Sequence, residues 1–256
     1  MIASLPMYDF PPLQAAHDRL WAAIHAGLNA RGIVAPPSLT RGQTDLWPEW
    51  QSPDLILSQT CGFPYRARLH GHVALVGTPD YGLPGCGAGE YCSVLVARAD
   101  DARMDLAAFD GAVLAYNEPL SQSGWAAPIT AAIAAGIRLV AGPRTGAHLA
   151  SARAVAEGQA DLAAIDAVTW ALANRHGLVV PGLREVGRTE PTPGLPYISA
   201  KGADAKAVFV AIADAIATLD AETRALLHLR GLVAIPSEAY LAVPIPPPPD
   251  EFRAIR

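Results

Sequence analysis

Short apolar runs alternate with longer amphipathic segments along most of the chain. Runs such as 55–57, 93–97 and 112–115 have the length of buried strands. The segment 13–28, in contrast, carries apolar residues at every third or fourth position, which is the period of a helix packed on a sheet. This alternation predicts an α/β fold in which mostly parallel sheets are flanked by helices.

The same pattern predicts the individual elements. We expect strands at 2–6, 38–39, 55–57, 73–77, 93–97, 112–115, 138–141 and 161–165. We expect helices at 11–31, from 126 onward, at 148–157, 205–219 and 221–229, with a short helix or loop at 46–50. The proline-rich tail after Val243 is expected to form an extended strap or a disordered end.

Two stretches rich in Gly and Pro, 78–91 and 188–199, lack helical periodicity. A complete set of alternating strands and helices lies between them. Each stretch is therefore interpreted as a crossing between two domains. The expected organisation is one lobe made of 1–85 and 195–256, with a second lobe, 86–194, inserted in it.

The polar segment that follows the apolar run 112–115 leads into an alanine-rich helix. Ser121, Ser123 and Gly124 stand where that helix begins. The first turn of a helix has amide N–H groups without intrahelical partners and carries a partial positive charge, which suits an oxyanion. The alternative is that one of the serines only caps the helix.

Other polar residues also follow predicted strands or begin predicted helices. In α/β folds such positions meet at one edge of a sheet, where ligands bind. His148 is a candidate hydrogen-bond partner of an anion, and Asp166 of a protonated oxyanion; the alternatives are a core histidine, a capping Thr145 and a capping Asp166. The clusters are Tyr8 with Asp9, Gln59 with Thr60, Thr145 to His148 with Ser151, and Asp166 with Thr169.

Composition narrows the classes of partner. The 256 residues carry a net charge of −5 without a cluster of Lys and Arg, which argues against nucleic-acid binding. No uninterrupted apolar run reaches the length of a membrane span, so we expect no membrane insertion. The three cysteines form no CxxC pair and no zinc-type array with histidine, and we expect neither a metal nor a cofactor.

The presence of Ser, His and Asp requires a hydrolase triad to be considered. No GxSxG turn occurs, and nothing in the sequence shows that His148 reaches Ser121 or Ser123. The segment 142–151 lacks the lysine of a phosphate-binding loop, and the Gly-rich GCGAGEY precedes a predicted strand rather than a helix. We therefore assign no catalytic residue.

Seven short motifs occur in order along the chain: SLPMYD at 4–9, LSQTCGFPY at 57–65, GTPDYGLPGC at 77–86, SQSGW at 121–125, TGAHLAS at 145–151, ADLAAIDAVTW at 160–170 and PTPGLPYI at 191–198. Together they resemble the PhnD-like group of phosphate, phosphite and phosphonate substrate-binding proteins of ABC transporters. The likeness extends from Ser4 to about Leu229. It implies a type 2 periplasmic-binding-protein fold, in which two lobes joined by two crossing segments close on a ligand.

The resemblance also implies roles for residues and partners. In the family the serine-rich turn grips phosphoryl oxygens, which corresponds to Ser121, Ser123 and Gly124 here. His148 and Asp166 would face the ligand. By analogy the opposing lobe would contribute Tyr8, Gln59 and Thr60. The expected function is binding of a small anionic ligand, phosphonate-like or phosphate-like, in the cleft between the lobes, with an ABC permease as partner.

Two features depart from the family pattern. The chain as written begins almost directly with its first predicted strand and has no signal peptide, which indicates the cytoplasm, whereas the resemblance implies the periplasm. Trp125, Phe63 and Tyr65 add aromatic surface that suits an organic ligand better than bare phosphate. The alternative function is a cytoplasmic enzyme or sensor on the same fold that acts on a small organic anion.

Overall fold

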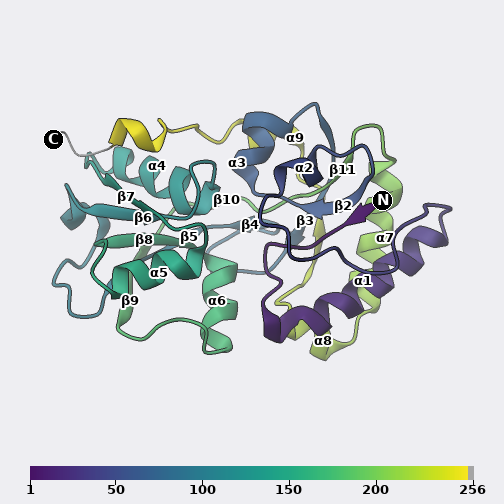
Figure 1. Cartoon of the computed structure of the whole chain (residues 1–256), viewed down its shortest axis with the longest axis horizontal. Helices are drawn as coiled ribbons and strands as arrows, with labels where there is room; N and C mark the ends of the chain where they lie inside the picture. Colours follow the sequence, from purple (N-terminus) through teal and green to yellow (C-terminus); the bar gives the residue numbers. More distant parts are fainter. Residues whose placement is uncertain (253–256) are drawn as a thin grey trace. The chain divides into compact units, whose positions relative to one another are not determined.

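The computed structural model describes residues 1–252, and its chain folds into two compact units (Figure 1). Unit 1 consists of residues 1–90 and 193–241, and unit 2 consists of residues 91–192 and those from 242 onward. The tail from Ala242 thus groups with unit 2, whereas the positions of the Gly/Pro-rich crossings predicted that it belongs to the first lobe. Residues 253–256 of that predicted tail lie outside the described residues.

The helices and strands alternate in both units, as the sequence pattern predicted. In unit 1 they are β1 Ile2–Ala3, α1 Gln14–Asn29, α2 Trp47–Trp50, β2 Leu55–Gln59, α3 Gly62–Pro64, β3 Val73–Asp80, β11 Tyr197–Ala200, α7 Ala205–Thr218, α8 Ala221–Leu226, β12 Gly231–Val233 and α9 Ser237–Leu241. In unit 2 they are β5 Ser93–Arg98, β6 Val113–Tyr116, α4 Ala127–Ala134, β7 Val140–Arg144, α5 His148–Ala156, β8 Leu162–Asp166, α6 Ala167–Arg175 and β9 Leu183–Arg188. Two short strands, β4 Glu90–Tyr91 and β10 Thr192–Pro193, pair with each other where the chain passes between the units. Shorter helical turns are η1 Pro11–Leu13, η2 Tyr65–Leu69, η3 Leu106–Phe109, η4 Gln122–Ala126 and η5 Pro249–Phe252.

The sheet of unit 1 has the strand order β1-β2-β11-β3-β12. Only β1 and β2 run parallel, and the other neighbours are antiparallel. The expected mostly parallel sheet is therefore wrong for this unit, although the α/β class is confirmed. The cause is that β11 comes from the returning part of the chain and pairs between β2 and β3 in the opposite direction.

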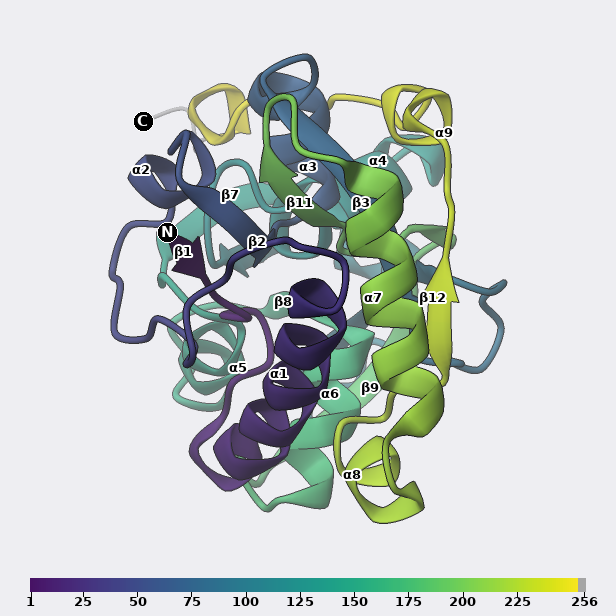
Figure 2. The same cartoon turned by 90° about the vertical axis from the view of Figure 1, so that its right-hand side faces the viewer.

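Two long helices of unit 1 pack side by side, α1 and α7 (Figure 2). They approach closely at Gly27, where an added Cβ would lie 3.2 Å from the carbonyl oxygen of Ala211. Helix α7 also packs on β3, where Gly77 leaves room for the ring of Phe209. Small residues at these contacts let the helices and the sheet form one closely packed core.

The predicted strand at 38–39 is wrong, because this segment has no regular structure. It is held instead by single contacts, including a hydrogen bond of 2.7 Å from the Thr40 amide to the Ala3 carbonyl. The neighbouring Arg41 forms ion pairs with Asp9 at 2.5 Å and with Asp18 at 2.7 Å. These contacts hold the long connection between α1 and α2 in place without strand pairing.

The sheet of unit 2 has the order β7-β6-β8-β5-β9. Strands β7, β6 and β8 are parallel, whereas β5 and β9 pair in antiparallel fashion, so this sheet is mixed as well. Each of the three parallel strands leads into a helix: β6 into η4 and α4, β7 into α5, and β8 into α6. Helix α4 covers one face of the sheet and α5 the other (Figure 1). Three helices therefore begin at the same edge of the sheet.

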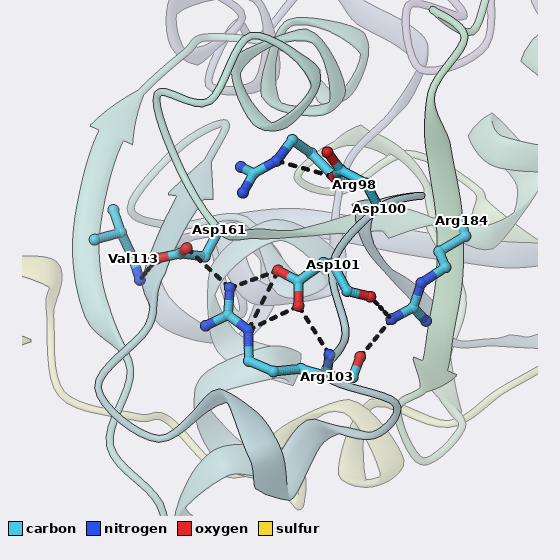
Figure 3. A network of polar contacts seen from close by, with 7 residues as sticks. All are labelled: Arg98, Asp100, Asp101, Arg103, Val113, Asp161 and Arg184. Carbon is cyan, nitrogen blue, oxygen red and sulfur yellow. Dashed lines mark hydrogen bonds and ion pairs between the residues drawn. The ribbon is translucent and has the colours of Figure 1, made fainter.

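A polar network ties the opposite edge of this sheet together (Figure 3). Asp161, just before β8, accepts a hydrogen bond from the Val113 amide and pairs with Arg103, both at 2.9 Å. Arg103 also pairs with Asp101 at 2.6 Å, and Arg184 of β9 donates to the Asp101 carbonyl at 2.8 Å. The loop between β5 and β6 is thereby anchored to the beginnings of β6 and β8.

Within residues 1–252, no helix is long and apolar enough to cross a membrane. The three cysteines are free thiols. The same part of the chain holds no group of three or more His, Cys, Asp or Glu that could bind a metal ion.

Candidate functional site

The turn Ser121–Gly124 begins the helical segment that continues into α4. Ser121 is the N-cap, and its Oγ accepts a hydrogen bond of 2.9 Å from the Gly124 amide. Its carbonyl accepts from the amides of both Trp125 and Ala126, at 3.2 and 3.0 Å. The second bond spans five residues and widens the turn into a π-helix, a form often found at functional sites. Ser121 thus caps the helix, which confirms that part of the alternative interpretation. Ser123 stands at the second helical position, within the first turn, where backbone amides lack an acceptor inside the helix.

Gly124 is required at its position by steric contact rather than by backbone conformation. A Cβ atom added there would lie only 1.9 Å from Oδ1 of Asn117 and 3.2 Å from Oγ of Ser121. Asn117 directly follows β6, at the same edge of the sheet, and sequence reasoning did not single it out. Its position just after a predicted strand was the signal that could have identified it.

Ser123 and His148 lie 25 positions apart in the sequence and form a direct hydrogen bond. Ser123 Oγ lies 2.9 Å from His148 Nε2. His148 is the first residue of α5, and its Nδ1 is buried. This contact unites two of the predicted residues, and the sequence alone did not reveal it.

Burial lowers the pKa of His148 to about 4, because a charged imidazolium loses its solvation there. The ring is therefore neutral near pH 7, with one nitrogen as donor and the other as acceptor. When Nε2 carries the hydrogen, it donates to Ser123 Oγ, and the hydroxyl hydrogen of Ser123 is left to donate to a ligand oxygen. When Nδ1 carries it and donates to the Ala164 backbone, the Ser123 hydroxyl donates to Nε2 instead.

Asp166 ends β8 and caps α6, where its Oδ1 accepts from the Thr169 amide at 2.9 Å. The capping interpretation is therefore confirmed. Across the sheet Asp166 is the register partner of Ser93, whose Oγ donates to the Ser123 carbonyl at 2.9 Å. Ser93 links the end of β8 to the turn after β6, and it was missed because it looked like an ordinary first residue of a strand.

Thr145 supports this edge of the sheet without capping a helix. The N-cap of α5 is Ala147, so the alternative interpretation, in which Thr145 caps this helix, is wrong. Its Oγ1 lies 2.6 Å from Ser151 Oγ, and its amide donates to the Tyr116 carbonyl at 2.9 Å. The amide bond joins the ends of β6 and β7, and the hydroxyl bond connects the loop after β7 to α5.

In unit 2, the five predicted residues Ser121, Ser123, Gly124, His148 and Asp166 stand at the beginnings of three helices on one sheet edge. The N-terminus of a helix carries a partial positive charge from its aligned peptide dipoles. Three such ends, with serine hydroxyls and a neutral imidazole among them, form an environment that favours negative charge. The arrangement suits an oxyanion better than a cation.

In unit 1, the three predicted residues Tyr8, Gln59 and Thr60 are buried, and the first two of them contact Tyr81. Gln59 Nε2 donates to Tyr81 Oη at 3.3 Å and to the Leu195 carbonyl at 3.1 Å. The ring of Tyr8 packs edge-on against that of Tyr81, with centroids 5.2 Å apart. Thr60 follows Gln59, and its amide donates to the Pro196 carbonyl at 3.0 Å. Tyr81 was not predicted, although it lies within the motif GTPDYGLPGC.

Comparison with known proteins gives a consistent picture. Residues 54–236 match the family model described as ABC transporter, phosphonate, periplasmic substrate-binding protein. No curated protein matches the chain.

Solved structures with a similar fold include PhnD1 from Prochlorococcus marinus in complex with methylphosphonate, at 15% identity and a TM-score of 0.68, covering 93% of this chain and 94% of that one. XAC2383 from Xanthomonas citri, in its structure bound to ATP, is 17% identical with a TM-score of 0.66 and covers 94% of each chain. A binding protein component of an ABC phosphonate transporter from Pseudomonas aeruginosa is 16% identical with a TM-score of 0.64, covering 91% of this chain and 81% of that one. At these identities the likeness shows the fold.

Proposed function

Because the chain belongs to the family of periplasmic substrate-binding proteins of ABC phosphonate transporters, we propose that it binds a small phosphonate-like or phosphate-like oxyanion and delivers it to an ABC permease. The oxyanion would be held by the turn Ser121–Gly124 of unit 2 together with His148. The observation that carries the proposal is the hydrogen bond between Ser123 and His148 at the first turn of a helix.

The chemistry of this turn fits a phosphoryl group. Such a group offers several charged oxygens, and each can accept hydrogen bonds from amides and hydroxyls. The amide of Ser123 supplies a donor within the first helical turn, and its hydroxyl supplies another when His148 carries its hydrogen on Nε2. Hydrogen bonds at a helix start hold an anion without a lysine or arginine, which agrees with the net charge of −5.

Asp166 gives the proposed site a means of selection. A carboxylate repels a fully ionised oxyanion but accepts a hydrogen bond from a protonated one. Near neutral pH a substantial fraction of phosphate, phosphite and phosphonate molecules still carries an acidic proton, whereas sulfate carries none. We therefore infer that sulfate binds more weakly than methylphosphonate.

A thermal-shift panel tests the proposal. Methylphosphonate, phosphite, phosphate, sulfate and benzoate are compared at equal ionic strength. A ligand present at a hundred times its dissociation constant stabilises the fold by about 2.7 kcal/mol, which raises the melting temperature measurably. We expect the phosphorus oxyanions to raise it and sulfate to raise it least. A rise with benzoate and with none of the oxyanions would contradict the proposal.

A further inference from the structure

Trp125 directly follows the oxyanion turn and is fully buried in unit 2. Its ring contacts Tyr116, the last residue of β6, with centroids 5.1 Å apart. It also packs nearly perpendicular to the ring of Phe252 in η5, with centroids 5.7 Å apart. The indole Nε1–H donates to the Pro247 carbonyl at 3.1 Å. One side chain therefore joins the oxyanion turn to the C-terminal segment.

The C-terminal segment 247–252 has the properties of a stiff support. The four residues after Ile245 are all prolines, and the last of them, Pro249, begins η5, so the backbone has few accessible conformations. A second contact fixes the end of the segment, because Arg138 Nη2 donates to the Glu251 carbonyl at 3.3 Å. Turn η5 also packs against β7.

The turn has little freedom to absorb a displacement of Trp125. The amides of Trp125 and Ala126 both donate to the Ser121 carbonyl, so the residue that carries the indole is bonded to the cap of the turn. Gly124, between them, is in contact with Asn117 and has no room to shift toward it. A movement of the indole is therefore passed on to Ser123 and to the first-turn amides.

We propose that Trp125 is a positioning residue for the oxyanion turn and that the C-terminal segment 247–252 holds it in place. This inference rests on the proposed function, because it assigns Trp125 to the support of the same turn. Trp125 would act through a buried indole hydrogen bond and an aromatic contact, because its ring is fully buried.

Substitution of Trp125 by Phe tests the hydrogen bond, because Phe keeps an aromatic ring and lacks the indole donor. The chain offers a matched control in Trp21 of unit 1, which is equally buried and donates from Nε1 to the Pro36 carbonyl at the same distance, 3.1 Å. Methylphosphonate affinity is measured by isothermal titration calorimetry on full-length variants. We expect Trp125→Phe to weaken binding at least about fivefold, the lower end of typical coupling between a support and a site. Trp21→Phe is expected to leave affinity unchanged.

Phe252→Ala supplies a second test with a readout that needs no ligand. Hydrogen exchange of the Trp125 and Ala126 amides, both bonded to the Ser121 carbonyl, is followed in the ligand-free protein. We expect faster exchange in Phe252→Ala and in Trp125→Phe, and unchanged exchange in Trp21→Phe.

The two readouts separate the inference from the proposed function. If the wild-type protein binds methylphosphonate and Trp125→Phe binds it equally well, the positioning role is overturned and the proposed function stands. If the wild type binds no phosphorus oxyanion, the proposed function is contradicted, and so is the role of Trp125 in positioning a ligand site. Unchanged exchange in Phe252→Ala would overturn the support by the C-terminal segment whatever the ligand.

Discussion

At the scale of single residues, Gly124 gives the sharpest prediction. A methyl group there would collide with Asn117 Oδ1, so Gly124→Ala must displace either the asparagine or the turn. We expect a loss of about 1–3 kcal/mol in unfolding free energy, typical of overpacking, together with weaker methylphosphonate binding. Urea denaturation and calorimetry measure the two effects.

Controls for this prediction lie in the same unit. Gly187 in β9 has no atom closer than 3.9 Å to an added Cβ, so Gly187→Ala is expected to change stability by less than about 0.5 kcal/mol. The double variant Asn117→Ala, Gly124→Ala removes the side chain that the added methyl group would meet. We expect it to recover part of the lost unfolding free energy. Wild-type stability and affinity in Gly124→Ala alone would refute the steric explanation.

The residue types of the candidate site were predictable from the sequence, but their contacts were not. Ser121, Ser123 and Asp166 follow recognisable strands, and their capping groups follow from helix-start chemistry. The bond between Ser123 and His148, in contrast, depends on the adjacency of β6 and β7, which is set by the fold.

Three further residues were missed for the same reason. Asn117, Ser93 and Tyr81 look ordinary in the sequence, and only tertiary contacts give them a role.

At the scale of elements, strong periodicity predicted best. Helices α1, α5 and α7 begin and end within a few residues of their expected bounds. The strands β9, β11 and β12 were not predicted, because they are short or polar and depend on pairing with neighbours for their strand structure. The prediction of mostly parallel sheets was wrong as well. A run of apolar residues does not show which part of the chain supplies the neighbouring strand, and this decides whether the two strands are parallel.

The loop between β5 and β6 allows a prediction about stability (Figure 3). Hydrogen bonding to Arg103 holds the pKa of Asp101 well below its ordinary value. Burial alone would raise the pKa of Asp161, but the Val113 amide and Arg103 outweigh it and lower the pKa. We expect Arg103→Gln to cost about 1–3 kcal/mol of unfolding free energy at pH 7, because it leaves two partly buried carboxylates without their cation.

The pH dependence of this loss follows from the direction of the shifts. Carboxylates with lowered pKa stabilise the fold above their ordinary pKa of about 4, and this stabilisation disappears as the pH falls below it. The difference between Arg103→Gln and wild type should therefore shrink below about pH 4. Arg98→Gln is the control, since its partner Asp100, at 3.5 Å, is largely exposed and such pairs contribute less than about 1 kcal/mol. Equal losses in the two variants would contradict the role given to the network.

At the scale of the whole molecule, the chain is built from two α/β units, and its family is established by the match over residues 54–236. The sequence pattern predicted the α/β class and the presence of Gly/Pro-rich crossings. It did not predict that the C-terminal tail would pack on unit 2, because a proline-rich segment carries no periodicity that shows its partner. The tail's contacts with Trp125 are visible only in the fold.

The most direct test of the central claim is calorimetric titration of methylphosphonate into wild type, Ser123→Ala and Ser151→Ala. Ser151 is a matched control, because it is a buried serine of the same unit whose hydroxyl pairs with Thr145 and belongs to no proposed ligand contact. A hydrogen bond to a charged group contributes about 1.5–3 kcal/mol, so Ser123→Ala should bind at least about tenfold more weakly. Ser151→Ala should bind like wild type. Wild-type affinity in Ser123→Ala would contradict the claim that this turn holds the oxyanion.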